Sequence, residues 1–381
     1  MSRFRLALAV VAGLLLAGQA AAQEPWSASY YPFVIKGPND KASLVLHYQY
    51  AQAADYYDRV PFGKSFSAEA GANPDGSRFL VTRFKGPRMT SSSRLWVEAG
   101  TTRENRFGFF GLGNDAEESD ASDQRYVDRM RRTRYFVRVD ATQSLIGPLR
   151  FSAGLSLTRA DFGTLPGDTK FAGYCGTVLG TGVADPSGCG SDTDFITRAS
   201  LILDTRDLEF VTARGVLLEA GAFGGSGGWR YTGYYGQAKV FVSPREGMVF
   251  AVRVLGRHLS DDAPLDARYE VQTWEQNIPV LGGPETHRSF VYGRFTGQDV
   301  VVLNLEYRQD ILNLGDFGAF TAVGFLDAGR VKEEGLTENN DLHVGGGAGL
   351  ALRILRSTVL TFNFAWGGDG FLYSMGTGWM F

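Results

Sequence analysis

The sequence predicts an all-β protein that crosses a membrane as a single antiparallel barrel of about 16 strands. Glycine accounts for 49 of the 381 residues and aromatic residues for 13%, and the hydrophobic residues fall in short alternating stretches. After the first 22 residues no run of about 18 apolar residues follows, so we expect no membrane-spanning helix there. A secreted soluble β-sandwich is the alternative that composition leaves open.

Residues 1–22 have the pattern of a secretory signal peptide. Arg3 and Arg5 precede a long apolar run, which a stretch of alanines follows. We therefore expect the mature chain to be exported. Residues 23–41 carry aromatic side chains without strand periodicity, so we predict a short periplasmic segment there and the barrel over 42–381.

Charge and cysteine content exclude several classes of function. The formal net charge is −3 and nothing suggests a nucleic-acid partner. Cys175 and Cys189 lie in a glycine-rich loop, and an even number of cysteines in an exported protein favours one disulfide between them. No histidine or third cysteine is near, so we predict no metal site and no cofactor.

Strand-length stretches of alternating apolar and polar residues recur at the spacing of hairpins, with turn signals between them. The predicted strands are 43–50, 65–71, 78–84, 94–102, 135–144, 149–158, 195–204, 215–224, 234–242, 248–259, 300–309, 317–328, 342–354, 358–366 and 371–381. Single-chain bacterial barrels close with an even number of strands. We therefore place a sixteenth strand between Glu104 and Thr133.

The strand that follows Asp299 alternates most cleanly. Leu303 and Leu305 fall on one face, and Asn304 and Glu306 fall on the other. One face suits lipid or a core, and the other tolerates water.

The connection before that strand, residues 260–299, is far longer than a hairpin needs. Structureless loops beyond about 12–15 residues are usually functional or disordered. We predict a functional loop.

An ordered set of motifs in this region resembles the C-terminal barrel of the BamA/TamA superfamily of outer-membrane proteins, also called bacterial surface antigens. The motifs are Gly282-Gly283, Arg288-Ser289-Phe290, Gly293-Arg294-Phe295, Asn304-Leu305-Glu306-Tyr307-Arg308 and Phe325-Leu326-Asp327-Ala328-Gly329. Ser289 stands where the family usually has glycine. A second segment resembles the family's periplasmic turn through four residues, Asp204, Arg206, Asp207 and Gly215.

The resemblance implies that the loop folds into the lumen of a 16-stranded barrel. It also implies that Arg288 meets Asp327 and Glu306 there, since a guanidinium matches a carboxylate in two parallel hydrogen bonds. The alternative is that Arg288 caps an exposed loop.

The last strand is predicted to end in a lipid-facing row of aromatic side chains. The residues of that face are Phe371, Tyr373, Met375, Thr377, Trp379 and Phe381. Ser374, Gly376, Trp379 and Phe381 also resemble the C-terminal assembly signal of outer-membrane barrels.

Three functions are compatible with these features. The first is an outer-membrane barrel for protein insertion, translocation or membrane assembly, without the POTRA domains for which residues 23–41 are too few. The second is a passive pore. The third is a lipid hydrolase, which is disfavoured because no Gly-x-Ser-x-Gly motif accompanies the four histidines, His47, His258, His287 and His343. We predict a protein that is not an enzyme.

The outer membrane also sets the expected partners. They are outer-membrane lipids and lipopolysaccharide, the barrel-assembly machinery during biogenesis, and a client or periplasmic partner that the sequence does not identify.

Overall fold

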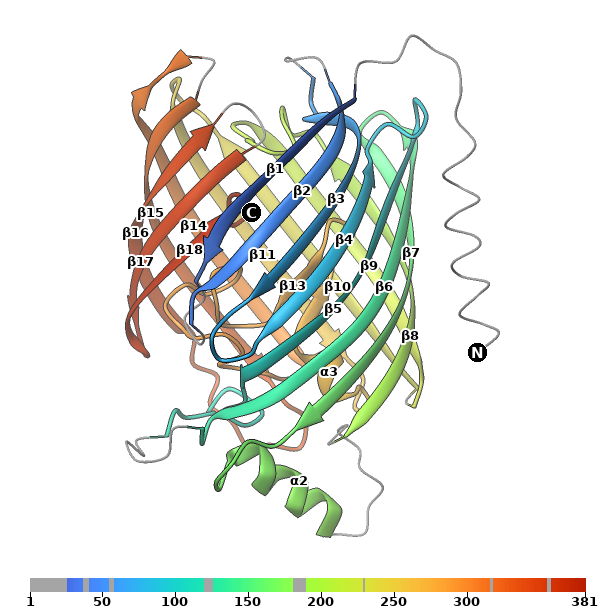
Figure 1. The fold of residues 1–381 in the computed structure, drawn as a ribbon, viewed down its shortest axis with the longest axis vertical. Helices are drawn as coiled ribbons and strands as arrows, with labels where there is room; N and C mark the ends of the chain where they lie inside the picture. The colour runs from blue at the N-terminus through green and yellow to red at the C-terminus, as the bar shows by residue number, and fades with distance from the viewer. Residues whose placement is uncertain are drawn as a thin grey trace.

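Sixteen antiparallel strands follow one another in a sheet that wraps into a nearly closed barrel (Figure 1). This confirms the predicted fold class. The computed structural model describes residues 26–36, 41–54, 58–119, 126–180, 190–228, 230–315, 318–354 and 358–381. The predicted signal peptide, residues 1–22, lies outside the described residues.

The barrel strands are β1 (Trp26–Ile35), β2 (Ser43–Ala53), β3 (Phe62–Ala72), β4 (Arg78–Gly86), β5 (Ser93–Gly108), β6 (Arg129–Ile146), β7 (Leu149–Gly163), β8 (Ser191–Asp204), β9 (Gly215–Gly227), β10 (Arg230–Val242), β11 (Met248–Leu259), β14 (Asp299–Asn313), β15 (Gly318–Lys332), β16 (His343–Ile354), β17 (Thr358–Gly367) and β18 (Gly370–Thr377). The connections hold a separate pair of strands and two helices, which are β12 (Glu270–Gln272), β13 (Asn277–Pro279), α2 (Lys170–Gly180) and α3 (Leu265–Arg268). In the described part of the chain no helix is long and apolar enough to cross a membrane.

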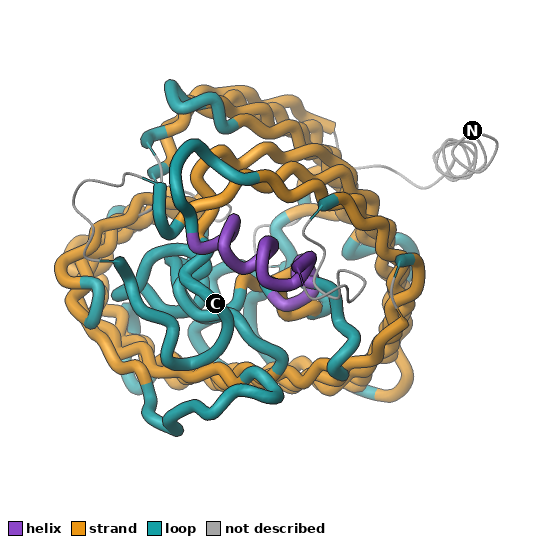
Figure 2. Tube along the Cα trace, turned by 90° about the horizontal axis from the view of Figure 1, so that it is seen from below, coloured by secondary structure: helices purple, strands orange, loops and turns teal. Residues whose placement is uncertain are grey.

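The connections differ between the two ends of the barrel. At one end, the long-loop end, they join β5 to β6, β7 to β8 and β11 to β14, and α2 lies over the opening (Figure 2). At the other end, the short-turn end, they include residues 147–148 and 205–214. Long loops on one side and short turns on the other are typical of outer-membrane barrels.

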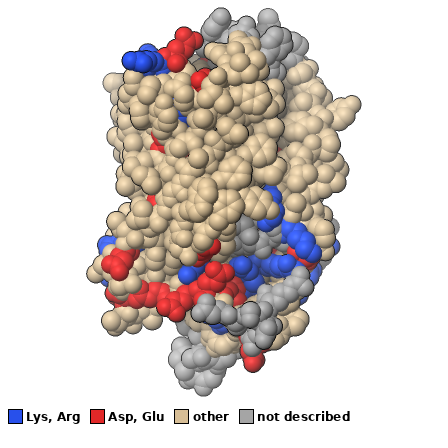
Figure 3. Space-filling model, turned by 90° about the vertical axis from the view of Figure 1, so that its left-hand side faces the viewer, with Lys and Arg blue, Asp and Glu red and all other residues tan. Residues whose placement is uncertain are grey.

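The strands separate an apolar outer face from a polar interior. On β14, Val301 is 46% exposed and Leu305 is 39% exposed, whereas Asn304 and Glu306 are buried, which confirms the alternation expected for this strand. Charged side chains gather near the two ends of the molecule, and the band between them shows few (Figure 3). Such a band exposes apolar surface that water would not solvate favourably but lipid would.

The structure corrects our interpretation of residues 23–41, because Trp26–Ile35 forms β1 and pairs in register with β2. Aromatic contacts across the pair hold it, with Trp26 stacked on Tyr50 and Tyr31 stacked on His47. The alternation is hidden because both faces of β1 carry aromatic side chains. A proline in the strand is compatible with its position at the edge of the sheet.

The sixteenth strand predicted between Glu104 and Thr133 is therefore wrong, although sixteen is the observed number. β5 extends to Gly108 and β6 begins at Arg129, so these two strands are longer than predicted. The described residues between them form loops and turns.

The chain end also differs from the prediction. β18 stops at Thr377, and Gly378 turns the backbone with a positive φ of 84°. Trp379 then packs with a cluster of interior side chains, and the Phe381 ring lies 6.2 Å from the Phe241 ring. The two aromatics thus leave the lipid-facing row, and the chain ends inside the ring of strands (Figure 2).

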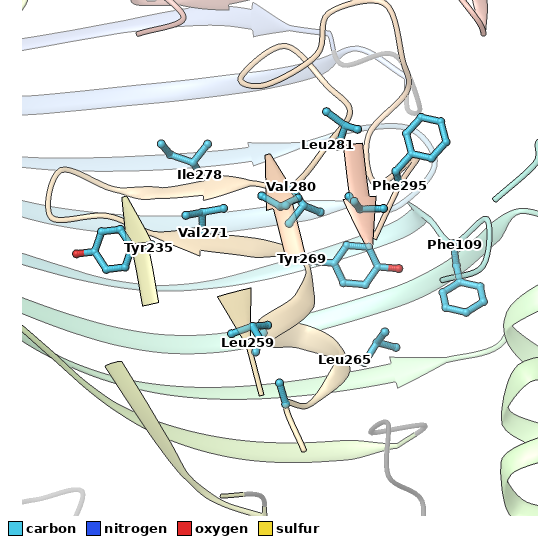
Figure 4. Close-up of a cluster of buried hydrophobic side chains, with 14 of the residues drawn as sticks. Phe109, Tyr235, Leu259, Leu265, Tyr269, Val271, Ile278, Val280, Leu281 and Phe295 are labelled. Carbon is cyan, nitrogen blue, oxygen red and sulfur yellow. The ribbon is translucent and has the colours of Figure 1, made fainter. Parts of the chain in front are cut away.

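The main hydrophobic core lies inside the barrel rather than between sheets. It joins side chains of the 260–298 connection to inward-facing side chains of the wall (Figure 4). Its members include Phe109, Tyr235, Leu259, Leu265, Tyr269, Val271, Ile278, Val280, Leu281 and Phe295. The connection therefore packs as an interior element of the barrel.

The position of the chain end generates a prediction for two tryptophans. In variants that retain only Trp366 or only Trp379, placed in vesicles with brominated acyl chains, Trp366 fluorescence should be strongly quenched, because its side chain is 56% exposed on the outer face. Trp379 fluorescence should be quenched little. Equal quenching of the two would contradict the inward turn at Gly378.

Candidate functional site

Arg288 lies deep in the barrel interior and contacts Asp327 and Glu306, the two carboxylates predicted to meet it. The Arg288 guanidinium contacts Asp327 through Nε at 2.9 Å and Nη2 at 2.9 Å, and Nη1 lies 2.5 Å from Glu306 Oε2. Its backbone N–H also donates to Asp327 at 3.0 Å. The three side chains are 2% exposed or less. Burial lowers the pKa of Arg288, but the two carboxylates outweigh burial and raise it above its ordinary value.

Neighbouring side chains fix the geometry of these carboxylates. Asn304, paired with Asp327 across β14 and β15, donates to Asp327 Oδ1 at 2.8 Å and to the Thr286 carbonyl at 2.6 Å. Arg308 donates to Glu306 Oε1 at 2.7 Å. The Phe325 ring lies 3.5 Å from the Arg288 guanidinium carbon. Arg288 is therefore bound by carboxylates of two neighbouring strands, β14 and β15, and is covered by the Phe325 ring.

The glycines of the loop motif permit tight turns. Gly282, Gly283 and Gly293 have φ values of 120°, 99° and 68°, a region that disfavours side chains. Phe290 packs edge-to-face on His287 at 4.6 Å and on Phe295 at 5.1 Å between ring centroids. The motif thus shapes the chain around Arg288.

Two glycines of the wall make room for Ser289. A Cβ added at Gly345 would lie 2.2 Å from Ser289 Oγ, and one added at Gly367 would lie 2.5 Å from Ser289 Cβ. The serine that replaces the usual glycine is accommodated by missing side chains on β16 and β17.

The 260–298 connection also contains a hairpin that sequence reasoning missed. β12 and β13 pair over Glu270–Gln272 and Asn277–Pro279, inside the barrel. Arg134 on β6 makes a two-pronged contact with the Glu270 carboxylate. Arg138, also on β6, donates to Asn277 at 2.6 Å. Three-residue strands give almost no periodic signal, and the charged side chains of Glu270 and Glu275 are the sequence feature that could have indicated contacts with the wall.

The hairpin tip reaches toward the short-turn end. Glu275 accepts from Arg206 at 2.7 Å and from Lys239 at 2.7 Å. The Trp274 backbone N–H donates to Glu219 on β9 at 3.0 Å. Burial would raise the pKa of Glu275, but the charges of Arg206 and Lys239 hold it below its ordinary value. The tip therefore carries an anion bound by two cations, one in the 205–214 turn and one on β10.

One wall side chain, Arg257, binds the backbone near both ends of the 260–298 connection. Arg257 on β11 donates to the carbonyls of Ala267 at 2.9 Å, Glu270 at 2.8 Å and Gln298 at 3.3 Å. These carbonyls lie at both ends of the connection, so Arg257 holds the hairpin arm and the return to β14 together.

In the turn over residues 205–214, the aspartates of the turn motif accept hydrogen bonds from the side chains and backbone of the same turn. Asp204 is fully buried and accepts from Arg206 Nε at 3.0 Å. Asp207 accepts from the backbone of Leu208 at 2.8 Å and of Ala213 at 3.1 Å. Gly215 has a φ of 112°, and a Cβ there would lie 2.5 Å from the Thr205 carbonyl.

The seam between the first and last strands is weakly joined. Among the described residues, β1 and β18 meet through one isolated bridge, Lys36 to Met375, with the Met375 N–H 3.4 Å from the Lys36 carbonyl. By contrast, β1 and β2 are in register over their full length.

The remaining predicted residues lie apart from this site. Ser374 faces inward at 9% exposure opposite Asn363, and Gly376 pairs with Thr361. Cys175 in α2 is disulfide-bonded, and its predicted partner, Cys189, lies outside the described residues.

The histidine partners bear on the hydrolase alternative. The hydrogen bonds of the described residues join His47 to Glu69, His258 to Asp299, His287 to the His343 carbonyl and His343 to Asn114. None of these contacts sets a serine hydroxyl against an imidazole, which a serine hydrolase needs.

Comparison with known families decides the assignment. The model of the Omp85 superfamily domain matches residues 62–377. This chain belongs to the Omp85 superfamily. The family resemblance predicted from the loop, strand and turn motifs is confirmed.

Solved structures of this Omp85 barrel type share its fold. The BamA structure from Haemophilus ducreyi lacking POTRA domains 1–3 superposes with a TM-score of 0.58 at 12% identity, over 93% of this chain and 70% of that one. CdiB from Escherichia coli gives 0.58 at 12% identity over 94% and 63%, and CdiB from Acinetobacter baumannii gives 0.54 at 9% identity over 94% and 60%. The chain thus spans less than two thirds of either CdiB. No curated protein sequence matches significantly.

The arginine site generates a double-mutant prediction. Arg288→Ala should lower the free energy of unfolding by about 3–5 kcal/mol, because it leaves the buried Asp327 carboxylate without its cation and leaves Glu306 with Arg308 alone. Asp327→Asn should also destabilise, and the double mutant should be less than additive because both changes remove one interaction. Urea titration with the heat-modifiable gel shift as readout measures this. Arg245→Ala, in an exposed turn, is the control; strict additivity would contradict a shared interaction.

The space that Gly345 and Gly367 leave for Ser289 generates a second prediction. Gly345→Ala should destabilise by about 1–3 kcal/mol, since its Cβ would overlap Ser289. Ser289→Gly in the same chain should restore stability. Gly324→Ala, where a Cβ meets open space, is the matched control and should change little. Failure of Ser289→Gly to rescue would show that another contact opposes the alanine.

Proposed function

We propose that this barrel inserts or translocates polypeptides at the outer membrane, and that it opens laterally between β1 and β18 to do so. The weak seam is the observation that carries the proposal. Unpaired backbone N–H and carbonyl groups within a membrane are costly unless another strand satisfies them. An edge that is joined by one bridge can therefore accept a strand from a client chain.

The family supports the same class of function. An Omp85 barrel like BamA and CdiB is of the translocation and assembly type. In this proposal the 260–298 connection keeps the lumen occupied while no client is present. Arg288 holds one arm of the connection to β14 and β15, and Glu275 holds the other to the 205–214 turn and to β10.

The proposal also orients the protein. The short-turn end faces the periplasm and the long-loop end faces the exterior, as in other outer-membrane barrels. The apolar band contacts outer-membrane lipid, and lipopolysaccharide surrounds the long-loop end. The chain itself reaches the membrane through the barrel-assembly machinery.

A passive pore is a weaker candidate. A pore needs a continuous aqueous path, whereas the interior packs the 260–298 connection against the wall through the core described above. Steady conductance of the purified wild-type protein in a planar bilayer would favour a pore.

The test joins the seam covalently. Cysteines at the bridged positions, Lys36→Cys with Met375→Cys, should form a disulfide that stops lateral opening. The control pair, Ile35→Cys with Ser43→Cys, lies on strands that are already in register. Cells that lack the native protein and carry one variant are compared by quantitative mass spectrometry of outer-membrane and secreted proteins.

We expect the seam-joined variant to lose the client proteins that the wild type supports, and reductant to restore them. The control pair should support them under both conditions. If the oxidised seam variant delivers the same proteins as the wild type, the seam is not the route.

A further inference from the structure

The turn over residues 205–214, which we call the strap, crosses the short-turn mouth of the barrel. Phe210 and Val211 pack against an interior cluster on the far wall. That cluster consists of Val323, Phe325, Ala351, Val359 and Ala365, on β15, β16 and β17. Since the strap joins β8 to β9, its middle reaches strands that are distant in the sheet order.

Contacts on the near side hold the strap from other strands. The Glu209 carboxylate accepts from Arg94 of β5 at 2.8 Å and pairs with Arg59 at 3.5 Å. The Glu209 backbone N–H donates to the Arg59 carbonyl at 3.0 Å. The strap therefore contacts the β2–β3 turn and β5 as well as the β15–β17 wall.

The strap is also contacted from inside the barrel. Arg206, at 5% exposure, is hydrogen-bonded to Asp204 beside it and donates to Glu275 at 2.7 Å. Glu275 belongs to the tip of the β12–β13 hairpin, whose chain enters from the long-loop end. Lys239 of β10 holds the same carboxylate at 2.7 Å, so the tip is fixed to the wall as well as to the strap.

We propose that the strap is a gate over the short-turn mouth and that the hairpin tip holds it closed through Glu275 and Arg206. When the hairpin withdraws, Arg206 keeps Asp204 beside it but loses Glu275, its contact with the hairpin, and the strap can leave the β15–β17 wall. Movement at the connection from the long-loop end is thereby communicated to the opposite mouth. The gate does not depend on which molecule passes, so it stands or fails apart from the proposed function.

A reporter on the strap tests the gate. Val211→Cys places a thiol where the strap packs on the far wall, and Cys175 is already disulfide-bonded. The rate at which a bulky maleimide labels this thiol in detergent micelles measures how often the strap leaves the wall. The heat-modifiable gel shift verifies that each variant is folded.

Two variants in the reporter background separate a local contact from a coupled one. Glu275→Gln removes the charge that Arg206 contacts. Trp274→Ala removes the ring that packs on Ile202 and Leu217 of the wall, so it changes how the tip is positioned while leaving Glu275 and Arg206 in place. Glu246→Gln, an exposed glutamate at the same mouth, is the control.

We expect both hairpin variants to increase the labelling rate roughly tenfold, the effect of losing a charge-assisted hydrogen bond, and Glu246→Gln to leave it unchanged. If Glu275→Gln does not fold, Trp274→Ala alone still decides. Unchanged labelling in the folded hairpin variants would overturn the gate. Acceleration by Glu275→Gln without acceleration by Trp274→Ala would overturn the coupling.

Discussion

The interior of this barrel depends on one buried cation between two carboxylates. Asp327 and Glu306 offset the cost of burying the Arg288 charge, because an unpaired buried charge costs several kcal/mol. The carboxylates lie on neighbouring strands, so the register of β14 with β15 determines where the loop attaches. The glycines of the loop motif allow the tight turns around Arg288. Gly345 and Gly367 leave room for Ser289, so the loop backbone can approach the wall closely enough for Arg288 to bind.

Sequence reasoning succeeded where one face of a strand is apolar and the other polar. Periodicity predicted the alternation of β14, whereas the grouping of Arg288 with Asp327 and Glu306 was implied by the resemblance of ordered motifs. Sequence reasoning missed β1, whose two faces are both aromatic, and it kept Trp379 and Phe381 on a strand that Gly378 ends. Periodicity does not reveal that Arg308 lies 4.1 Å from the Trp379 ring and draws it inward.

The barrel is closed in two physically different ways. Backbone hydrogen bonds join neighbouring strands from β1 to β18, whereas the described part of the seam has one bridge. The lumen is filled by side-chain contacts, chiefly arginines that hold carboxylates and carbonyls of one connection. Such contacts can break one by one while the strands stay paired, so the 260–298 connection can move without unfolding the barrel wall.

The central claim is that this connection, held by Arg288, closes the lumen. Conductance of single molecules in a planar bilayer tests it most directly, with wild type compared with Arg288→Ala. The account predicts a closed or rarely open wild type and a variant with larger and longer openings, because its loop arm leaves the β14–β15 wall. Equal conductance of the two proteins would contradict the account.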